Sequence, residues 1–118
     1  HLYSAAMYAD DPVLLLFTTC PDQDSASRIA RHLVEERLAA CVTRLGTVTS
    51  TYLWDGALHE DAEVQLLIKT TVGRLDAAMA RLSALHPYEL PEMIAVEATA
   101  GLPDYLDWIR AQTREERC

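Results

Sequence analysis

The sequence predicts an α+β fold in which helices cover one face of a single antiparallel sheet. Its segments follow the order strand, helix, strand, strand, helix, strand, and a further helix closes the series. An Asp55-Gly56 pair between the two central β-rich runs is a strong hairpin signal. Half of the 118 residues are hydrophobic, which suffices for one core. These observations predict a ferredoxin-like βαββαβ sandwich with an extended central β-hairpin and an extra C-terminal helix.

The first strand and helix follow from an apolar run and an amphipathic segment. Residues 13–19, VLLLFTT, are short and apolar, which predicts a strand buried on both faces. Asp22 or Asp24 can cap the helix that follows. Residues 24–37 place apolar side chains at helical spacing with charged ones opposite, so we expect this helix to pack on the sheet.

The central hairpin is longer than a domain of this size can hide. Its first arm, residues 41–54, spans about 45 Å at roughly 3.3 Å per residue, whereas a compact chain of this length has a diameter of about 35 Å. The second arm, residues 63–70, is nearly continuous in apolar residues. A projecting ribbon that carries Tyr52 and Trp54 exposes apolar surface, so we expect burial against further copies of the chain. Alternatively, Gly46 bends or bulges the strand and folds the hairpin back.

The second half repeats the pattern of the first. Helical spacing predicts a helix over 73–85, and the prolines of the connector 86–92, HPYELPE, end it. Residues 92–99 are expected to form a strand, and residues 103–113 a last helix that begins with a proline. We assign 13–118 to one domain and interpret 1–12 as a tag remnant or flexible leader.

Composition excludes several classes of protein. The net charge of −8 and pI of about 4.8 argue against a nucleic-acid binder, which needs a basic face. No apolar run reaches the roughly 20 residues of a membrane span. The three cysteines Cys20, Cys41 and Cys118 are widely spaced and form no CxxC pair, which indicates a reducing, cytoplasmic setting. No phosphate loop, GxSxG elbow or HExxH motif occurs, so no enzyme is predicted.

The connector concentrates groups that can bind a metal ion. His86, Glu89 and Glu92 offer an imidazole and two carboxylates, a combination that suits Zn²⁺ or Cu²⁺. In the simpler interpretation the segment is a rigid connector in which His86 caps the helix and Tyr88 bonds to backbone. Cys20 lies where a helix N-terminus lowers a thiol pKa, which favours a ligand or nucleophile, although an idle or redox-sensitive thiol is the simpler interpretation.

Other polar groups have structural interpretations. Lys69 ends an apolar strand, where it can pair with an acid such as Glu92 or meet an anion. Tyr52 and Trp54 are interpreted as interface anchors. Charged groups near the hairpin tip are interpreted as a guard against unwanted strand pairing, and they comprise His59, Glu60, Asp61 and Glu63.

Several motifs in the same order resemble the divalent-cation-tolerance (CutA) family. They are LVEERLAACV (33–42), Ser50-Thr-Tyr52-Leu-Trp54 followed by Asp55-Gly56, Glu63 leading into LLIKT (66–70), HPYELPE (86–92), and Gly101 with YLDWI (105–109). The resemblance extends over residues 13–113. It implies a ferredoxin-like fold, a homotrimer built through the hairpins, a cytosolic or organellar setting, and a role in tolerance of copper and other divalent cations.

The resemblance also implies a site. It points to His86 and Glu92 as metal ligands, with Glu89 nearby. The family cysteine position is occupied by Thr18, and Cys20 is the nearby thiol. Five further residues are expected to line or support the cleft between subunits: Tyr52, Trp54, Lys69, Tyr88 and Trp108.

The predicted function is that of a non-enzymatic homotrimer that binds divalent cations such as Cu²⁺ at inter-subunit clefts, with no organic cofactor. The alternative is a signalling or scaffold trimer, similar in architecture to PII-type regulators, whose cleft binds a small molecule or a partner protein. A third interpretation, an enzyme with Cys20 as nucleophile, needs a histidine within hydrogen-bond reach of the sulfur.

Overall fold

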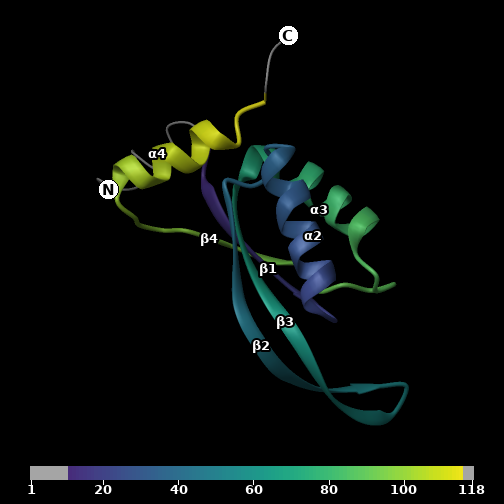
Figure 1. The fold of residues 1–118 in the computed structure, drawn as a ribbon. Helices are drawn as coiled ribbons and strands as arrows, with labels where there is room; N and C mark the ends of the chain where they lie inside the picture. Colours follow the sequence, from purple (N-terminus) through teal and green to yellow (C-terminus); the bar gives the residue numbers. More distant parts are fainter. Residues whose placement is uncertain (1–10, 116–118) are drawn as a thin grey trace.

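The computed structural model describes residues 11–115, and its elements follow the predicted order. The strands β1 (Val13–Cys20), β2 (Cys41–Trp54), β3 (Ala57–Thr71) and β4 (Ile94–Glu97) form one antiparallel sheet in the order β2-β3-β1-β4. The helices are α2 (Gln23–Glu35), α3 (Val72–Leu85) and α4 (Pro103–Gln112), and α2 and α3 lie side by side on one face (Figure 1). The predicted fold class is confirmed. Most of the expected leader, and Cys118, lie outside the described residues.

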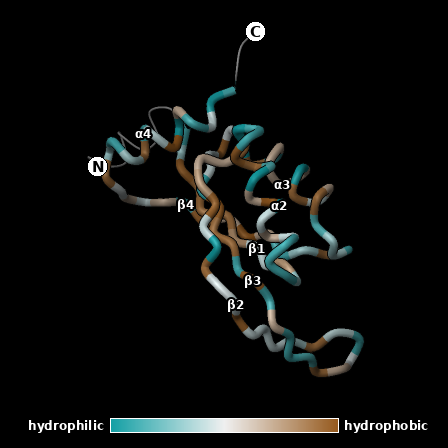
Figure 2. Tube along the Cα trace, viewed as in Figure 1, coloured by the Kyte–Doolittle hydropathy of each residue, from teal (hydrophilic) through white to brown (hydrophobic). Residues whose placement is uncertain are grey.

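The core lies between the sheet and the two helices α2 and α3. Alternate residues of β3 point toward the helices because side chains alternate along a strand, and apolar residues concentrate along β1 and the inner part of β3 (Figure 2). Leu66 and Ile68 are fully buried there against Ile29 and Leu33 of α2 and Leu82 of α3. A smaller cluster under α4 holds Val13, Ala40, Leu106 and Ile109.

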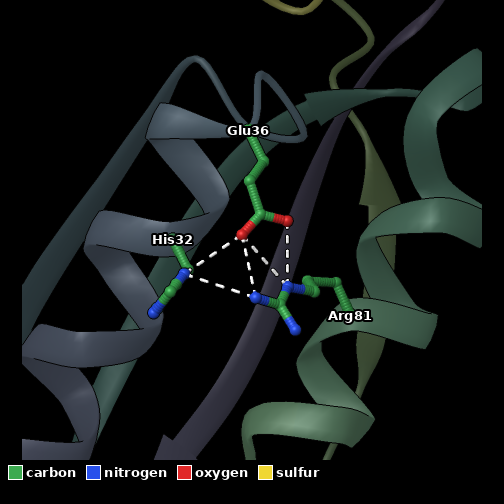
Figure 3. A network of polar contacts seen from close by, with 3 residues as sticks. All are labelled: His32, Glu36 and Arg81. Carbon is green, nitrogen blue, oxygen red and sulfur yellow. Dashed lines mark hydrogen bonds and ion pairs between the residues drawn. The ribbon is translucent and has the colours of Figure 1, made fainter.

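Polar contacts fix the helices locally. Asp22 is the N-cap of α2, because its carboxylate accepts a hydrogen bond from the Ser25 backbone N–H at 2.8 Å. This bond lowers the pKa of Asp22. Arg81 of α3 donates to Glu36 just beyond α2 at 2.9 Å, and the His32 imidazole lies 3.1 Å from the same carboxylate (Figure 3). This network is exposed, so it orients the helices more than it stabilises them.

The hairpin remains paired along its whole length and projects from the domain. Its ladder runs from Cys41 opposite Lys69 to Trp54 opposite Ala57, so the second arm begins well before residue 63. The molecule measures 47 × 36 × 22 Å with a radius of gyration of 15.4 Å, above the 13–14 Å or so of a compact chain. In Figure 1 the hairpin extends beyond the helices and curves at its far end.

The bend that the sequence suggested at Gly46 is present, but it does not fold the hairpin back. The register shifts between Arg44 and Gly46, and Gly46 has φ of 117°, which marks a bulge that re-aims the strand. At the tip, Asp55 and Gly56 both have positive φ, at 51° and 76°, as a tight two-residue turn requires. The strand therefore has the bulge of the second alternative, but the hairpin still projects as the first alternative requires. Its burial against further copies stays a prediction.

The last strand is shorter than predicted, and it is Ile94–Glu97 in place of 92–99. It pairs with β1 and, at the end of the strand order, has no second neighbour within residues 11–115. Its Ile94 and Val96 are exposed opposite Phe17 and Leu15 of β1, on the side of the sheet that α2 and α3 leave uncovered. No helix among the described residues is long and apolar enough to cross a membrane.

Candidate functional site

The connector between α3 and β4 meets the projecting hairpin at a hollow of about 650 Å³. Strand alternation places Tyr52 and Trp54 of β2 on one face of the hairpin with His59 and Glu63 of β3. The hollow is lined by Thr19, Ser50, Thr51, Tyr52, Trp54, His59, Glu63, Pro87, Tyr88, Glu89, Leu90 and Glu92. The structure thus brings together five residues that the sequence predicted for the site: Tyr52, Trp54, Tyr88, Glu89 and Glu92.

His86 holds the connector in place and does not line this hollow. It is buried, and its Nε2 lies 2.8 Å from the Thr19 carbonyl oxygen, while the Tyr88 backbone N–H donates to its Nδ1 at 3.1 Å. One neutral tautomer, protonated at Nε2, satisfies both bonds. Its backbone N–H also donates to Leu82 and ends α3. This arrangement matches the simpler interpretation of His86, because a metal ion at either ring nitrogen displaces a bond that orders the connector.

Glu63 lines this site together with His59, and the sequence interpretation placed neither of them there. The Glu63 side chain is buried, with 8% of the residue exposed, and its carboxylate accepts a hydrogen bond from the Tyr88 hydroxyl at 2.9 Å. Burial, together with this bond, raises the pKa of Tyr88, so the phenol stays a neutral donor. The expected roles were an edge guard for Glu63 and a backbone bond for the Tyr88 side chain, and both are corrected. Sequence alone offered one signal, the position of Glu63 at the start of the apolar run.

The outer wall of the hollow comes from the hairpin. The Tyr52 hydroxyl donates to the Asp61 carboxylate, which raises the pKa of Tyr52. The Tyr52 ring stacks on His59 directly across the ladder, with centroids 5.3 Å apart. Trp54 lies at the outer end and is half exposed. Along this face of the hairpin the rings of Tyr52, Trp54 and His59 lie toward the tip, and the carboxylate of Glu63 lies toward the domain.

Cys20 faces the core rather than the hollow. It is fully buried, and burial, reinforced by the charges of Asp22 and Glu63, raises the pKa of its thiol to about 11. The expectation that the helix N-terminus lowers this pKa is wrong, because desolvation outweighs it. Within the described residues the Cys20 thiol has no hydrogen-bond partner, so the structure provides no base for a Cys20 nucleophile. Thr18, two positions earlier, is also buried, and its hydroxyl has no hydrogen-bond partner among residues 11–115.

Lys69 and Trp108 belong to a different cluster near α4. The Lys69 ammonium donates to the Tyr105 hydroxyl at 2.9 Å and lies 5.2 Å from the centre of that ring. The hydrogen bond raises the pKa of Lys69. Tyr105 stacks on Trp108 with centroids 5.5 Å apart. Lys69 therefore does not pair with Glu92, and neither Lys69 nor Trp108 lines the hollow.

The residues of one chain do not by themselves fit a resident metal ion. Glu89 and Glu92 are exposed at the hollow, but His86 is committed to backbone bonds and the Cys20 thiol is buried and protonated. Within residues 11–115 no three His, Cys, Asp or Glu side chains lie close enough together to hold a metal ion. Transition metals in proteins usually take three or four such ligands.

Fold and site together define a class: a ferredoxin-like α+β protein with a projecting hairpin and an acidic, aromatic hollow at its base. The model of the CutA1 divalent ion tolerance protein family matches residues 14–112. The chain therefore belongs to that family.

Individual relatives agree with this assignment. A crystal structure of CutA from Xylella fastidiosa is 54% identical, with a TM-score of 0.86 over 87% of this chain and 99% of that chain. The divalent-cation tolerance protein CutA of Thermus thermophilus is 44% identical over 84% of this chain and 96% of its own length. Protein CutA of Mus musculus is 41% identical over 93% of this chain, which spans 62% of the mouse protein.

Proposed function

We propose that this chain acts in divalent-cation tolerance as a non-enzymatic homotrimer that binds cations such as Cu²⁺ in clefts between its subunits. The family membership supports the cation-tolerance role. The observation that carries the proposal is the projecting hairpin, because it extends the acidic hollow beyond the body of the domain, where a neighbouring copy can reach it.

Two apolar surfaces support association. The outer hairpin exposes 70% of Leu53 and 67% of Leu58, which pair with each other on the face opposite to the hollow. The uncovered face of the sheet adds Ile94 and Val96. Such surfaces mark interaction sites in proteins of this size, and a closed symmetric assembly buries them together with the free edges of the sheet.

The charge of the hollow supports cation binding. Glu63, Glu89 and Glu92 line it, while no lysine or arginine does so among the described residues. One subunit supplies an incomplete ligand set, so a metal site at this position requires side chains from a second copy. We assign Glu89 and Glu92 as the accessible ligands. His86 joins them only if it gives up its bond to Thr19 or to the Tyr88 backbone.

The second candidate function is that of a signalling or scaffold trimer whose cleft takes a small molecule. The shape of the hollow favours it, since about 650 Å³ lined partly by aromatic rings is typical of a small-molecule pocket and exceeds the space a bare ion needs.

Two measurements test the leading proposal. Light scattering should give about three times the subunit mass of 13.2 kDa. Calorimetric titration with Cu²⁺ should then show affinity at least about tenfold weaker in the Glu89→Gln/Glu92→Gln double variant, because two charged ligands are lost. A Glu35→Gln variant on α2 serves as the control that shows the effect of removing one negative charge away from the hollow.

A folded monomer at micromolar concentration contradicts the proposed trimer. Equal Cu²⁺ affinities in the double variant and the Glu35→Gln control contradict the assigned ligands. His86→Ala, checked by circular dichroism because of its role in the connector, separates a ligand from a structural residue. If it folds and binds Cu²⁺ as the wild type does, His86 is not in the site.

A further inference from the structure

The buried carboxylate of Glu63 has no cationic partner within the described residues. Its one hydrogen bond comes from the neutral Tyr88 hydroxyl, and no Lys, Arg or His forms an ion pair with it. Among the described residues only the Thr18 and Thr71 hydroxyls are fully buried without a partner, so the second oxygen of Glu63 is open to the hollow. Glu63 lines the hollow, so a cation that enters the hollow can supply the missing charge.

The lining of the hollow that contains Glu63 suits an organic cation. Tyr52, Trp54 and Tyr88 contribute aromatic rings, and Pro87 and Leu90 add apolar surface. The faces of aromatic rings attract ammonium groups, and rings combined with a carboxylate are the usual means of binding alkylated amines. Glu89 and Glu92 add negative charge to the same lining, which raises the local concentration of cations.

A metal ion fits this lining less well than an organic cation does. The described residues contain no group of three ligating side chains, and aromatic faces do not replace them. An alkylammonium ion needs only one buried carboxylate and an apolar surround. A hollow of about 650 Å³ also falls within the range of small-molecule sites, roughly 300–1,000 Å³.

We propose that this hollow binds a small organic ammonium ion, with Glu63 as the charge partner and the rings of Tyr52, Trp54 and Tyr88 as the walls. The proposal goes beyond cation tolerance and requires neither copper binding nor assembly, because all of the named groups belong to one chain. For the second candidate function, the signalling or scaffold trimer, it names the class of small molecule that binds.

The test compares benzylamine, which is protonated at neutral pH, with the neutral benzyl alcohol of similar shape. Isothermal titration calorimetry of the full chain should show benzylamine binding at least about tenfold more tightly than the alcohol, because only the amine pairs with Glu63. The Glu63→Gln variant keeps an acceptor for Tyr88 but loses the charge, so its benzylamine affinity should fall by about tenfold or more. Glu63→Asp retains the charge and should bind more tightly than Glu63→Gln.

Glu35→Gln is the matched control, because it removes one negative charge from α2, away from the hollow, and should bind benzylamine as the wild type does. Equal affinities for the amine and the alcohol, no benzylamine binding, or equal effects of Glu63→Gln and Glu35→Gln overturn the proposal. If Glu63→Gln does not fold, the ratio of the wild-type affinities for benzylamine and benzyl alcohol decides the outcome. A ratio of about tenfold or more supports the proposal, and a ratio near one overturns it. Mass and Cu²⁺ titration are measured separately, so this inference can fail while the proposed trimer stands, and the reverse.

Discussion

The two halves of the hairpin share one ladder but differ in what lies around it. In the inner half Val64, Leu66 and Ile68 are buried between β1 and the helices. In the outer half Leu53 and Leu58 face water, although their backbones pair as regularly as those of the inner half. Backbone pairing is thus satisfied throughout, whereas apolar burial is confined to one half. An isolated two-stranded ribbon is marginal in water, so the outer half depends on the inner half, and in the proposed homotrimer on neighbouring copies.

The largest effect is expected from paired truncations in the two halves. Leu66→Ala removes a fully buried side chain and should lower the free energy of unfolding by about 3 kcal/mol. Leu58→Ala should leave the fold of the subunit intact and weaken assembly instead. Urea unfolding and light scattering measure the two effects. The proposed difference between the two halves is contradicted if Leu58→Ala lowers the free energy of unfolding as much as Leu66→Ala does, at a concentration where both variants are monomeric.

The junction between the halves is tested by Gly46→Ala. An added Cβ at Gly46 has nothing within 4 Å, so its cost comes from the backbone, whose φ of 117° is unfavourable for alanine. We expect a loss of about 2 kcal/mol in the free energy of unfolding. Thr47→Ala, the next residue, is the control on strand propensity. A loss no larger than that of the control indicates that the bulge does not need glycine.

Alkaline pH should destabilise the fold through Cys20 of β1, which pairs with Val64 of the inner half. The pKa of this thiol is about 11 in the fold against 9.0 for the free group, so the folded state keeps its proton where the unfolded chain loses it. Stability is therefore complete below pH 9 and falls as pH rises toward 11, by at most about 1.4 kcal/mol per pH unit. Urea unfolding of wild type and Cys20→Ala across this range isolates the contribution. Parallel pH profiles for the two proteins contradict it.

The smallest expected effect is the gain in stability when Thr18 is replaced by valine. Its buried hydroxyl has no hydrogen-bond partner within the described residues. Valine has nearly the same shape and no polar atom, so Thr18→Val should raise the free energy of unfolding by about 1 kcal/mol. Thermal denaturation measures the gain. A loss would mean that a bound water or another group satisfies this hydroxyl.

Much of the candidate site could be predicted from the sequence, because its parts lie in distinctive local segments. The two prolines of HPYELPE mark a rigid connector, which brings Tyr88, Glu89 and Glu92 to one hollow, while their roles at a cleft between subunits stay predictions. Glu63 was missed because only its position at the start of the apolar run distinguishes it from the other acids near the hairpin tip. The bond between Tyr88 and Glu63 joins residues 25 positions apart, and only packing creates it.

The errors share a physical cause. The expected effect of the helix N-terminus on Cys20 is local, while the burial that reverses the shift of its pKa comes from β3 and the helices. Lys69 was expected to meet an acid, but α4 places Tyr105 beside it. Both outcomes depend on elements distant in sequence. Charge and exposure are properties of the packed molecule rather than of the local segment.

The sequence by itself determined the order of the elements, the tight turn at Asp55 and Gly56, and a hairpin longer than the domain, because periodicity, turn residues and chain length act locally. Only the tertiary structure decided which groups face the hollow and which are buried without a counter-charge. Those properties depend on removal from water, and this removal is complete only when the sheet, the helices and the connector have packed together.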